Sequence, residues 1–245
     1  MPPHQAYGGI TAARLWGLPI RHPWEAEEPL VIARVNGTSR GRAVGTRAIA
    51  VHQGLWRPAQ HHGLQLLPPA VTALTLAREL DHEALVQVVD ALLTDSLRYP
   101  DLALPTRPHM TLEQARAFAA LCGGLVGARA LAAAVDDGRA GVDSRFETIT
   151  RLLIVAAGLP EPEVHPLVAI DGLELHPDLG YPAWRIGIEY EGKQHLDTVR
   201  RDGDIDRYAL FEAAGWLTVP VTKGDMARRG ARFLARLQRT IARRA

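Results

Sequence analysis

The sequence predicts an α/β protein of two domains, in which an N-terminal α+β or largely helical domain precedes a core of helices around a mixed sheet. The main observation is the order of patterns after an acidic, glycine-containing turn at residues 136–141: helix, three strands, helix, strand, helix. Composition agrees, because 245 residues with 47% hydrophobic and 22% charged residues can form buried cores. We therefore expect domains at residues 1–138 and 139–245.

Short elements are expected in the first domain. Residues 11–18 have a helical pattern, and residues 30–35 and 47–52 alternate as strands do. Apolar residues at helical spacing then predict helices over 71–80, 83–97 and 112–135. Thr111 and Gln114 have the spacing of a capping box at the start of the last helix. No group of residues in this domain has catalytic spacing.

The second domain is expected to begin with a helix over residues 144–157, opened by Ser144 and closed by Gly158. Strands over 164–170 and 173–178 surround an Asp-Gly hairpin turn, and a third strand covers 185–191. A helix over 204–214, a strand over 216–221 and a basic helix from about residue 225 complete the predicted core.

Three carboxylates are the most informative residues of the core. Glu189 and Glu191 share one face of the third strand, and Asp178 joins them if the preceding strand pairs alongside. Converging carboxylates repel one another unless a cation neutralises them, and oxygen ligands favour Mg²⁺ or Mn²⁺. The simpler interpretation is that both glutamates face solvent and that Asp178 is a turn residue before Gly180.

Several other classes of protein are excluded or disfavoured. The chain has no apolar run of about 18 residues, so we expect no transmembrane helix. We identify no secretory signal, and the single cysteine, Cys122, cannot form an internal disulfide. Glycine loops for phosphates, the serine nucleophile elbow and zinc-ligand spacings are also missing. A cytoplasmic location is therefore expected, without contact with a membrane.

Residues 143–225 resemble the very-short-patch-repair-like branch of the PD-(D/E)XK nuclease superfamily, and within it an uncharacterised actinobacterial family. The resemblance covers about a third of the chain in a consistent order. The matching segments are Ser144-Arg-Phe-Glu147, Arg151-Leu-Leu, Ala157-Gly-Leu-Pro160-Glu-Pro162, Pro177-Asp178, Ile188-Glu-Tyr-Glu-Gly192, His195, Asp204 to Arg207 and Ala214-Gly-Trp216.

The resemblance implies a restriction-endonuclease-like core that binds Mg²⁺ or Mn²⁺ and hydrolyses phosphodiester bonds of DNA, in repair or in defence. Asp178 matches the metal-binding aspartate, and Glu189 falls at the second acidic position. Glu191 occupies the place of the usual lysine, and His195 matches the histidine of this branch. The group that orients the attacking water stays open among Glu191, Lys193, Gln194 and His195.

Glu147 has two interpretations. The spacing Ser144-x-x-Glu147 is that of a capping box, which is a sufficient structural reason for the glutamate. The resemblance places an acidic residue of this first helix at the metal site, and the two roles are compatible.

Arginines are the expected DNA-binding residues. Arg207 follows two aspartates at a helix start and could face the scissile phosphate, although solvated charges are common there. From residue 224 to the end, seven arginines stand against one acidic residue. Helical spacing puts five of them on one face, which either tracks a DNA backbone or simply faces solvent. They are Arg229, Arg232, Arg236, Arg239 and Arg243.

A second hypothesis is a DNA-binding regulator without turnover, because the usual lysine is replaced. The N-terminal region resembles the AbiEi-type antitoxin, a winged-helix regulator with its adjoining domain, on the segments 9–19 and 71–77. That resemblance allows either DNA recognition or dimerisation by this domain. We therefore expect the protein to bind double-stranded DNA and to associate with the nucleoid. The sequence does not decide whether it forms a homodimer.

Overall fold

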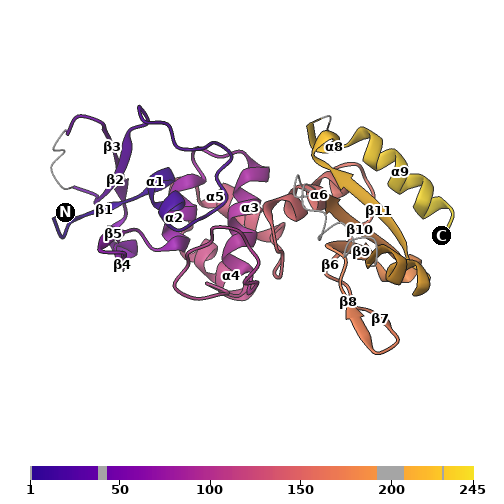
Figure 1. The fold of residues 1–245 in the computed structure, drawn as a ribbon. Coiled ribbons are helices and arrows are strands. Elements are labelled where there is room, and N and C mark those ends of the chain that lie inside the picture. Colours follow the sequence, from indigo (N-terminus) through magenta and orange to yellow (C-terminus); the bar gives the residue numbers. More distant parts are fainter. Residues whose placement is uncertain (1, 38–42, 192–206, 228) are drawn as a thin grey trace. The chain divides into compact units, whose positions relative to one another are not determined.

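The computed structural model describes residues 2–37, 43–191, 207–227 and 229–245 (Figure 1). The chain divides into two compact units, Met1–Ala140 and Gly141–Ala245, next to the expected boundary. Each unit has its own sheet, and each is described by itself below. None of the helices among the described residues is long and apolar enough to cross a lipid bilayer.

The N-terminal unit contains a five-stranded sheet with the order β3-β2-β1-β5-β4. Strand β1 pairs antiparallel with β2 and parallel with β5, β2 pairs parallel with β3, and β4 pairs antiparallel with β5. Strand β3 is thus an edge strand. The strands are β1 (Gln5–Tyr7), β2 (Leu30–Val35), β3 (Thr46–Val51), β4 (Ala59–His61) and β5 (Leu64–Leu66).

Five α-helices and a short 3₁₀ turn, η1 (Gln53–Leu55), accompany this sheet. The expected capping box of Thr111 and Gln114 is present. The single helix expected over 112–135 is wrong, because the chain turns at Gly124 and Gly127, whose φ angles of 83° and 91° do not fit a right-handed helix. The helices are α1 (Gly9–Leu15), α2 (Pro69–Leu76), α3 (His82–Leu93), α4 (Leu112–Leu121) and α5 (Ala128–Asp136).

The C-terminal unit is built on a mixed four-stranded sheet with the order β11-β10-β9-β6. Strands β10 and β11 are parallel, and the other pairs are antiparallel. The strands are β6 (Glu163–Val164), β9 (Leu179–Tyr181), β10 (Ile186–Glu191) and β11 (Leu217–Thr222). The short strand β9 was missed in the sequence, where Gly180 suggested a turn.

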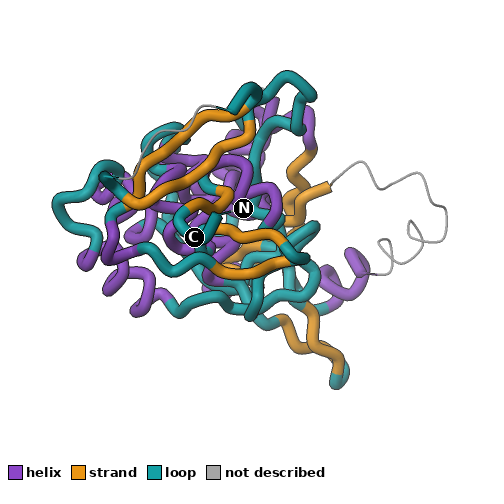
Figure 2. The backbone as a smooth tube through the Cα atoms, turned by 90° about the vertical axis from the view of Figure 1, so that its left-hand side faces the viewer, coloured by secondary structure: helices purple, strands orange, loops and turns teal. Residues whose placement is uncertain are grey.

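The expected long strand over 164–170 is two strands, because the backbone bends at His165, whose φ angle is 46°. Its second half, β7 (Val168–Ile170), pairs with β8 (Leu173–Leu175) around the predicted Asp171-Gly172 turn. This hairpin projects from the four-stranded sheet in both views (Figures 1 and 2). The expected strand end at Asp178 is therefore also wrong, since β8 ends at Leu175 and Asp178 immediately precedes β9.

Helices cover both faces of the four-stranded sheet. On one face, Ile154 of α6 (Arg145–Ala156) and Phe233 and Leu237 of α9 (Ala231–Ala242) pack on Ile186 and Val219. On the other face, Phe211 from the helical residues 207–213 packs with Trp216 and Val168. The predicted arrangement of a mixed sheet between helices is confirmed at this level.

The basic C-terminal segment is not the one continuous helix that was expected from about residue 225. It forms α8 (Lys223–Ala227) and α9, separated by a turn in which Arg229 and Gly230 have φ angles of 51° and 66°. A Cβ atom on Gly230 would lie 2.1 Å from Leu153 Cδ2, so a larger residue there would force Leu153 to move and would also adopt a strained positive φ angle.

Candidate metal centre

The start of helix α6 holds Glu147 in place. Ser144 is the N-cap residue, and its Oγ accepts the Glu147 N–H at 3.4 Å and donates to Glu147 Oε1 at 2.9 Å. The backbone N–H of Asp143 donates to Glu147 Oε2 at 2.7 Å. Ser144 caps the helix as predicted, but the Glu147 carboxylate accepts the N–H of Asp143, one residue before the N-cap, where a capping box would use the N–H of Ser144. Glu147 is buried and only 3% exposed.

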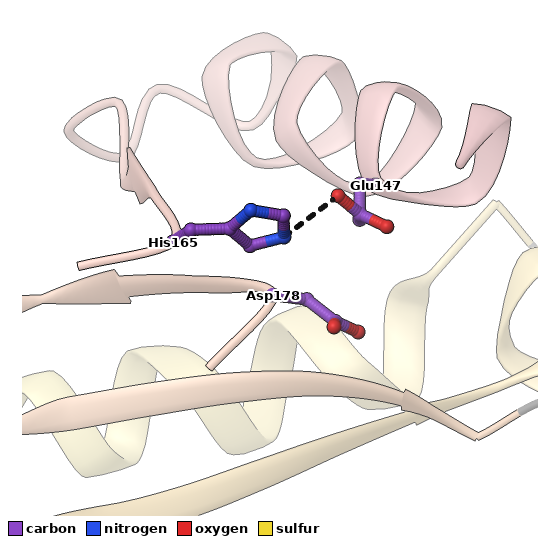
Figure 3. Close-up of side chains that lie close together, drawn as sticks. All are labelled: Glu147, His165 and Asp178. Atoms are coloured by element: carbon purple, nitrogen blue, oxygen red, sulfur yellow. Dashed lines mark ion pairs between the residues drawn. The ribbon is translucent and has the colours of Figure 1, made fainter. Parts of the chain in front are cut away.

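Glu147, His165 and Asp178 point toward one another from three segments of the C-terminal unit (Figure 3). One ligand atom from each lies within 4.8 Å of the other two. His165 Nε2 is 3.2 Å from Glu147 Oε2 and 3.9 Å from Asp143 Oδ2. Two carboxylates and an imidazole gathered at this spacing form a donor set suited to a divalent cation.

The backbone around the cluster fixes its geometry. The His165 N–H donates to the Asp178 carbonyl at 3.2 Å, which joins the bend after β6 to the residue before β9. Asp178 Oδ2 accepts the Tyr190 N–H of β10 at 2.7 Å. The Tyr190 ring in turn stacks on Phe146 of α6, with centroids 4.3 Å apart and planes 7° from parallel. These contacts tie α6, β9 and β10 together around the three side chains.

The pKa values of the cluster record the crowding of negative charge. Burial and the nearby charges of Glu189 and Glu147 raise the pKa of Asp178 to about 8. Burial also raises the pKa of Glu189, although Arg207 acts in the opposite direction. Burial lowers the pKa of His165, but the hydrogen bond and charge of Glu147 outweigh it, and the net pKa is raised.

Glu189 and Arg207 form an ion pair beside the cluster. Arg207 Nη2 donates to Glu189 Oε1 at 3.0 Å and to the His176 carbonyl at 2.6 Å, and the guanidinium lies 5.2 Å from the Phe211 ring centroid. The charge of Glu189 influences Asp178, which places the two carboxylates in one electrostatic environment. Arg207 therefore neutralises a carboxylate in this structure, where the sequence suggested that it faces DNA.

The structure brings together only some of the carboxylates that the sequence placed at one metal site. Asp178 and Glu147 are in the cluster, and Glu189 lies beside it. Glu191 Oε1 instead accepts a hydrogen bond from the Tyr208 hydroxyl at 3.2 Å, and neither Glu189 nor Glu191 belongs to the three-residue group found among the described residues. Lys193 and His195 lie outside the described residues, so the predictions for them stay predictions.

Sequence reasoning missed His165. It was placed inside a strand, where it had no reason to face Asp178, because the bend that turns it toward α6 is a left-handed backbone conformation at a single residue. The one available signal was the following proline, Pro166, which disfavours a regular central strand.

The arginines of the C-terminal segment divide into two groups. Arg236 Nη2 donates to the Pro220 carbonyl at the edge of β11 and to Asp225 Oδ2 at 3.0 Å, so this side chain covers a strand edge. With Arg239 and Arg243 it lines a groove of about 230 Å³ along β11. Arg232 is exposed on α9, and Arg229 lies in the turn before it. Arg232, Arg236, Arg239 and Arg243 keep the spacing of one face of α9, whereas Arg229 lies in the turn outside that helix. Whether this face binds DNA stays a prediction.

Comparison with known proteins identifies relatives along almost the whole chain. The uncharacterized proteins MT2308 and Rv2248, from two strains of Mycobacterium tuberculosis, are each 30% identical over 236 residues. The match covers 95% of this chain and 80% of each mycobacterial protein. The chain belongs to their family. The match extends over both units of the chain. No family model and no solved structure matches the chain.

Proposed function

We propose that the C-terminal unit is a metal-dependent DNA endonuclease, a hydrolase of phosphodiester bonds on a restriction-endonuclease-like core. The observation that carries the proposal is the group of Glu147, His165 and Asp178, with ligand atoms within 4.8 Å of one another. Its position supports the same conclusion, because the resemblance of residues 143–225 to the PD-(D/E)XK superfamily falls on the same helix and strands.

The residues fit a divalent cation. The carboxylates of Glu147 and Asp178 suit Mg²⁺ and Mn²⁺, and the imidazole of His165 is a ligand that Mn²⁺ accepts more readily than Mg²⁺. The raised pKa of Asp178 is a further indication, since a cation would relieve the repulsion that now favours its protonated form. Such an ion, when bound, lowers the pKa of a water ligand and stabilises the charge on a phosphate under attack.

Glu189 and Arg207 have roles beside that ion. Glu189 is the carboxylate next to the cluster, and burial raises its pKa, so it is a better proton acceptor for the attacking water than an ordinary carboxylate is. Arg207 holds the Glu189 side chain through Oε1 and keeps its carboxylate at the centre. The catalytic roles of Glu191, Lys193 and His195 remain proposals from the resemblance alone.

DNA binding is proposed for the basic groove along β11 and for the exposed arginines near it. Arg239 and Arg243 line the groove, Arg229 and Arg232 are exposed nearby in sequence, and Arg236 serves mainly to hold α9 on the edge strand. Guanidinium groups bind phosphate oxygens by paired hydrogen bonds, so this surface suits a nucleic-acid backbone. Binding should weaken steeply as salt rises.

The experiment is cleavage of supercoiled plasmid by the full chain in Mg²⁺, Mn²⁺ or EDTA. Asp178→Asn is the decisive variant, because asparagine can still accept the Tyr190 N–H but is a poor metal ligand. Glu174→Gln, an exposed carboxylate on β8, is the matched control. We expect nicking or linearisation that requires metal, persists in the control and is lost in Asp178→Asn. Metal-independent DNA binding without cleavage would instead support the regulator hypothesis.

A further inference from the structure

An open groove in the N-terminal unit runs along the edge strand β3. Its volume is about 590 Å³. One wall is β3 itself, which contributes five consecutive residues, 47–51. Because side chains alternate between the two faces of a strand, consecutive lining residues indicate that the edge of the strand, with its backbone, borders the groove. The opposite wall is apolar and consists of Val71 and Leu74 of α2 with Leu125 and Val126 from the segment between α4 and α5.

The backbone of β3 has unused hydrogen-bonding groups on this side. The carbonyls of Gly45 and Val51 accept bonds from Leu30 and Asn36, so alternate residues of β3 face β2. The intervening Ala48 and Ala50 therefore direct their N–H and C=O groups outward, and neither makes a hydrogen bond within the described part of the chain.

The usual protections of an edge strand are missing at these positions. The two outward-facing residues, Ala48 and Ala50, are small and exposed, and the residue between them, Ile49, is neither proline nor charged. The neighbouring Arg47 is held by Glu79 through contacts of 2.7 and 2.9 Å, which draws its guanidinium toward the end of α2. Among the described residues, an incoming strand would meet the outward backbone groups of Ala48 and Ala50.

We propose that this groove binds an extended acidic peptide of a partner protein, which adds to the sheet as a strand beside β3. Main-chain bonds to Ala48 and Ala50 would hold the peptide, and alternate aliphatic side chains would pack on Leu74 and Val126. The acidic character follows from Arg78, which is exposed at the rim and has no ion pair among the described residues, whereas Arg47 and Glu79 neutralise each other.

A single peptide strand fits this space better than a second copy of the chain. Strand β3 of a second copy would bring its own β2 beside it, paired along all six residues. The apolar wall of α2 and residues 125–126 leaves about 590 Å³, which accommodates a short strand but not a sheet.

The test uses random octapeptides displayed on phage and selected on the full-length protein, followed by fluorescence-polarisation titration of the enriched peptide. Ala48→Pro removes one outward N–H without removing a bond to β2, and Ala48→Ser keeps that N–H as the matched control. Arg78→Glu tests the charge, with Arg129→Glu, exposed on α5 and outside the groove, as its control. Circular dichroism verifies the fold of each variant.

We expect enriched peptides with alternating aliphatic residues and at least one acidic residue. Their affinity should fall about tenfold or more in Ala48→Pro and in Arg78→Glu, and stay unchanged in both controls. If no sequence is enriched, or if Ala48→Pro binds as well as the wild type, the proposal is wrong. Self-association of the chain in sedimentation velocity that disappears in Ala48→Pro would also overturn it, because a second copy would then occupy the edge.

Discussion

Replacing Glu147 by alanine should destabilise the C-terminal unit even in the absence of metal. The carboxylate accepts hydrogen bonds from the Asp143 N–H and the Ser144 hydroxyl and forms an ion pair with His165. Hydrogen bonds to a charged group contribute about 1.5–3 kcal/mol each, and water that enters the space left by the deleted side chain restores part of this. We therefore expect a loss of about 2–4 kcal/mol for Glu147→Ala, and about 1 kcal/mol for Glu147→Gln, which retains an acceptor oxygen.

Differential scanning calorimetry of the full chain in EDTA measures this difference. At about 4–8 °C for each kcal/mol in a domain of this size, Glu147→Ala should lower the melting temperature by 10 °C or more. Glu147→Gln should lower it by a few degrees, and the exposed Glu163→Ala on β6 should leave it unchanged. An alanine variant that melts with the wild type would refute the view that this carboxylate anchors the start of α6.

Three further predictions concern the C-terminal segment. Burial raises the pKa of Asp225, but hydrogen bonds from Arg236 and from the Thr222 N–H and hydroxyl lower it more, so the net pKa lies below the usual 3.8. The ionised Asp225 side chain therefore stabilises the fold fully above pH 3.8, and this stabilisation is lost as the pH falls through the lowered pKa. Acid titration of unfolding should accordingly show a weaker acid dependence for Asp225→Asn. Gly230→Ala should cost about 2 kcal/mol or more in urea denaturation, because alanine at a φ of 66° is strained and would contact α6; wild-type stability would contradict this. Charge reversal of both Arg239 and Arg243 should weaken DNA binding at every sequence and reduce the salt slope by about two, and an unchanged slope would exclude the groove.

Elements with strong local signals could be predicted from the sequence. The expected strand over 30–35 coincides with β2, and α6 begins after Ser144 as its capping pattern indicated. Strand β10 was also predicted within one residue at its start, because Ile186 and Ile188 alternate with residues of the opposite face. In these cases propensity, periodicity and capping agree with the tertiary structure.

The missed elements depend on contacts that are distant in sequence. Strand β9 has three residues and a central glycine, and exists as a strand because β6 and β10 pair on its two sides. A Cβ atom at Gly180 would lie 2.8 Å from the Ile186 carbonyl oxygen, so the glycine serves close strand packing and not a turn. The same holds for the site, where the meeting of His165 with Glu147 follows from a single left-handed residue.

The central claim is that Glu147, His165 and Asp178 bind one divalent cation. Electron paramagnetic resonance measures it directly, by counting free Mn²⁺ as it is titrated into the full chain. We predict one Mn²⁺ site per chain whose affinity falls at least tenfold in His165→Ala and in Asp178→Asn, and is unchanged in His22→Ala, an exposed histidine of the N-terminal unit. Equal Mn²⁺ binding by the wild type and both site variants would contradict the assignment of this centre.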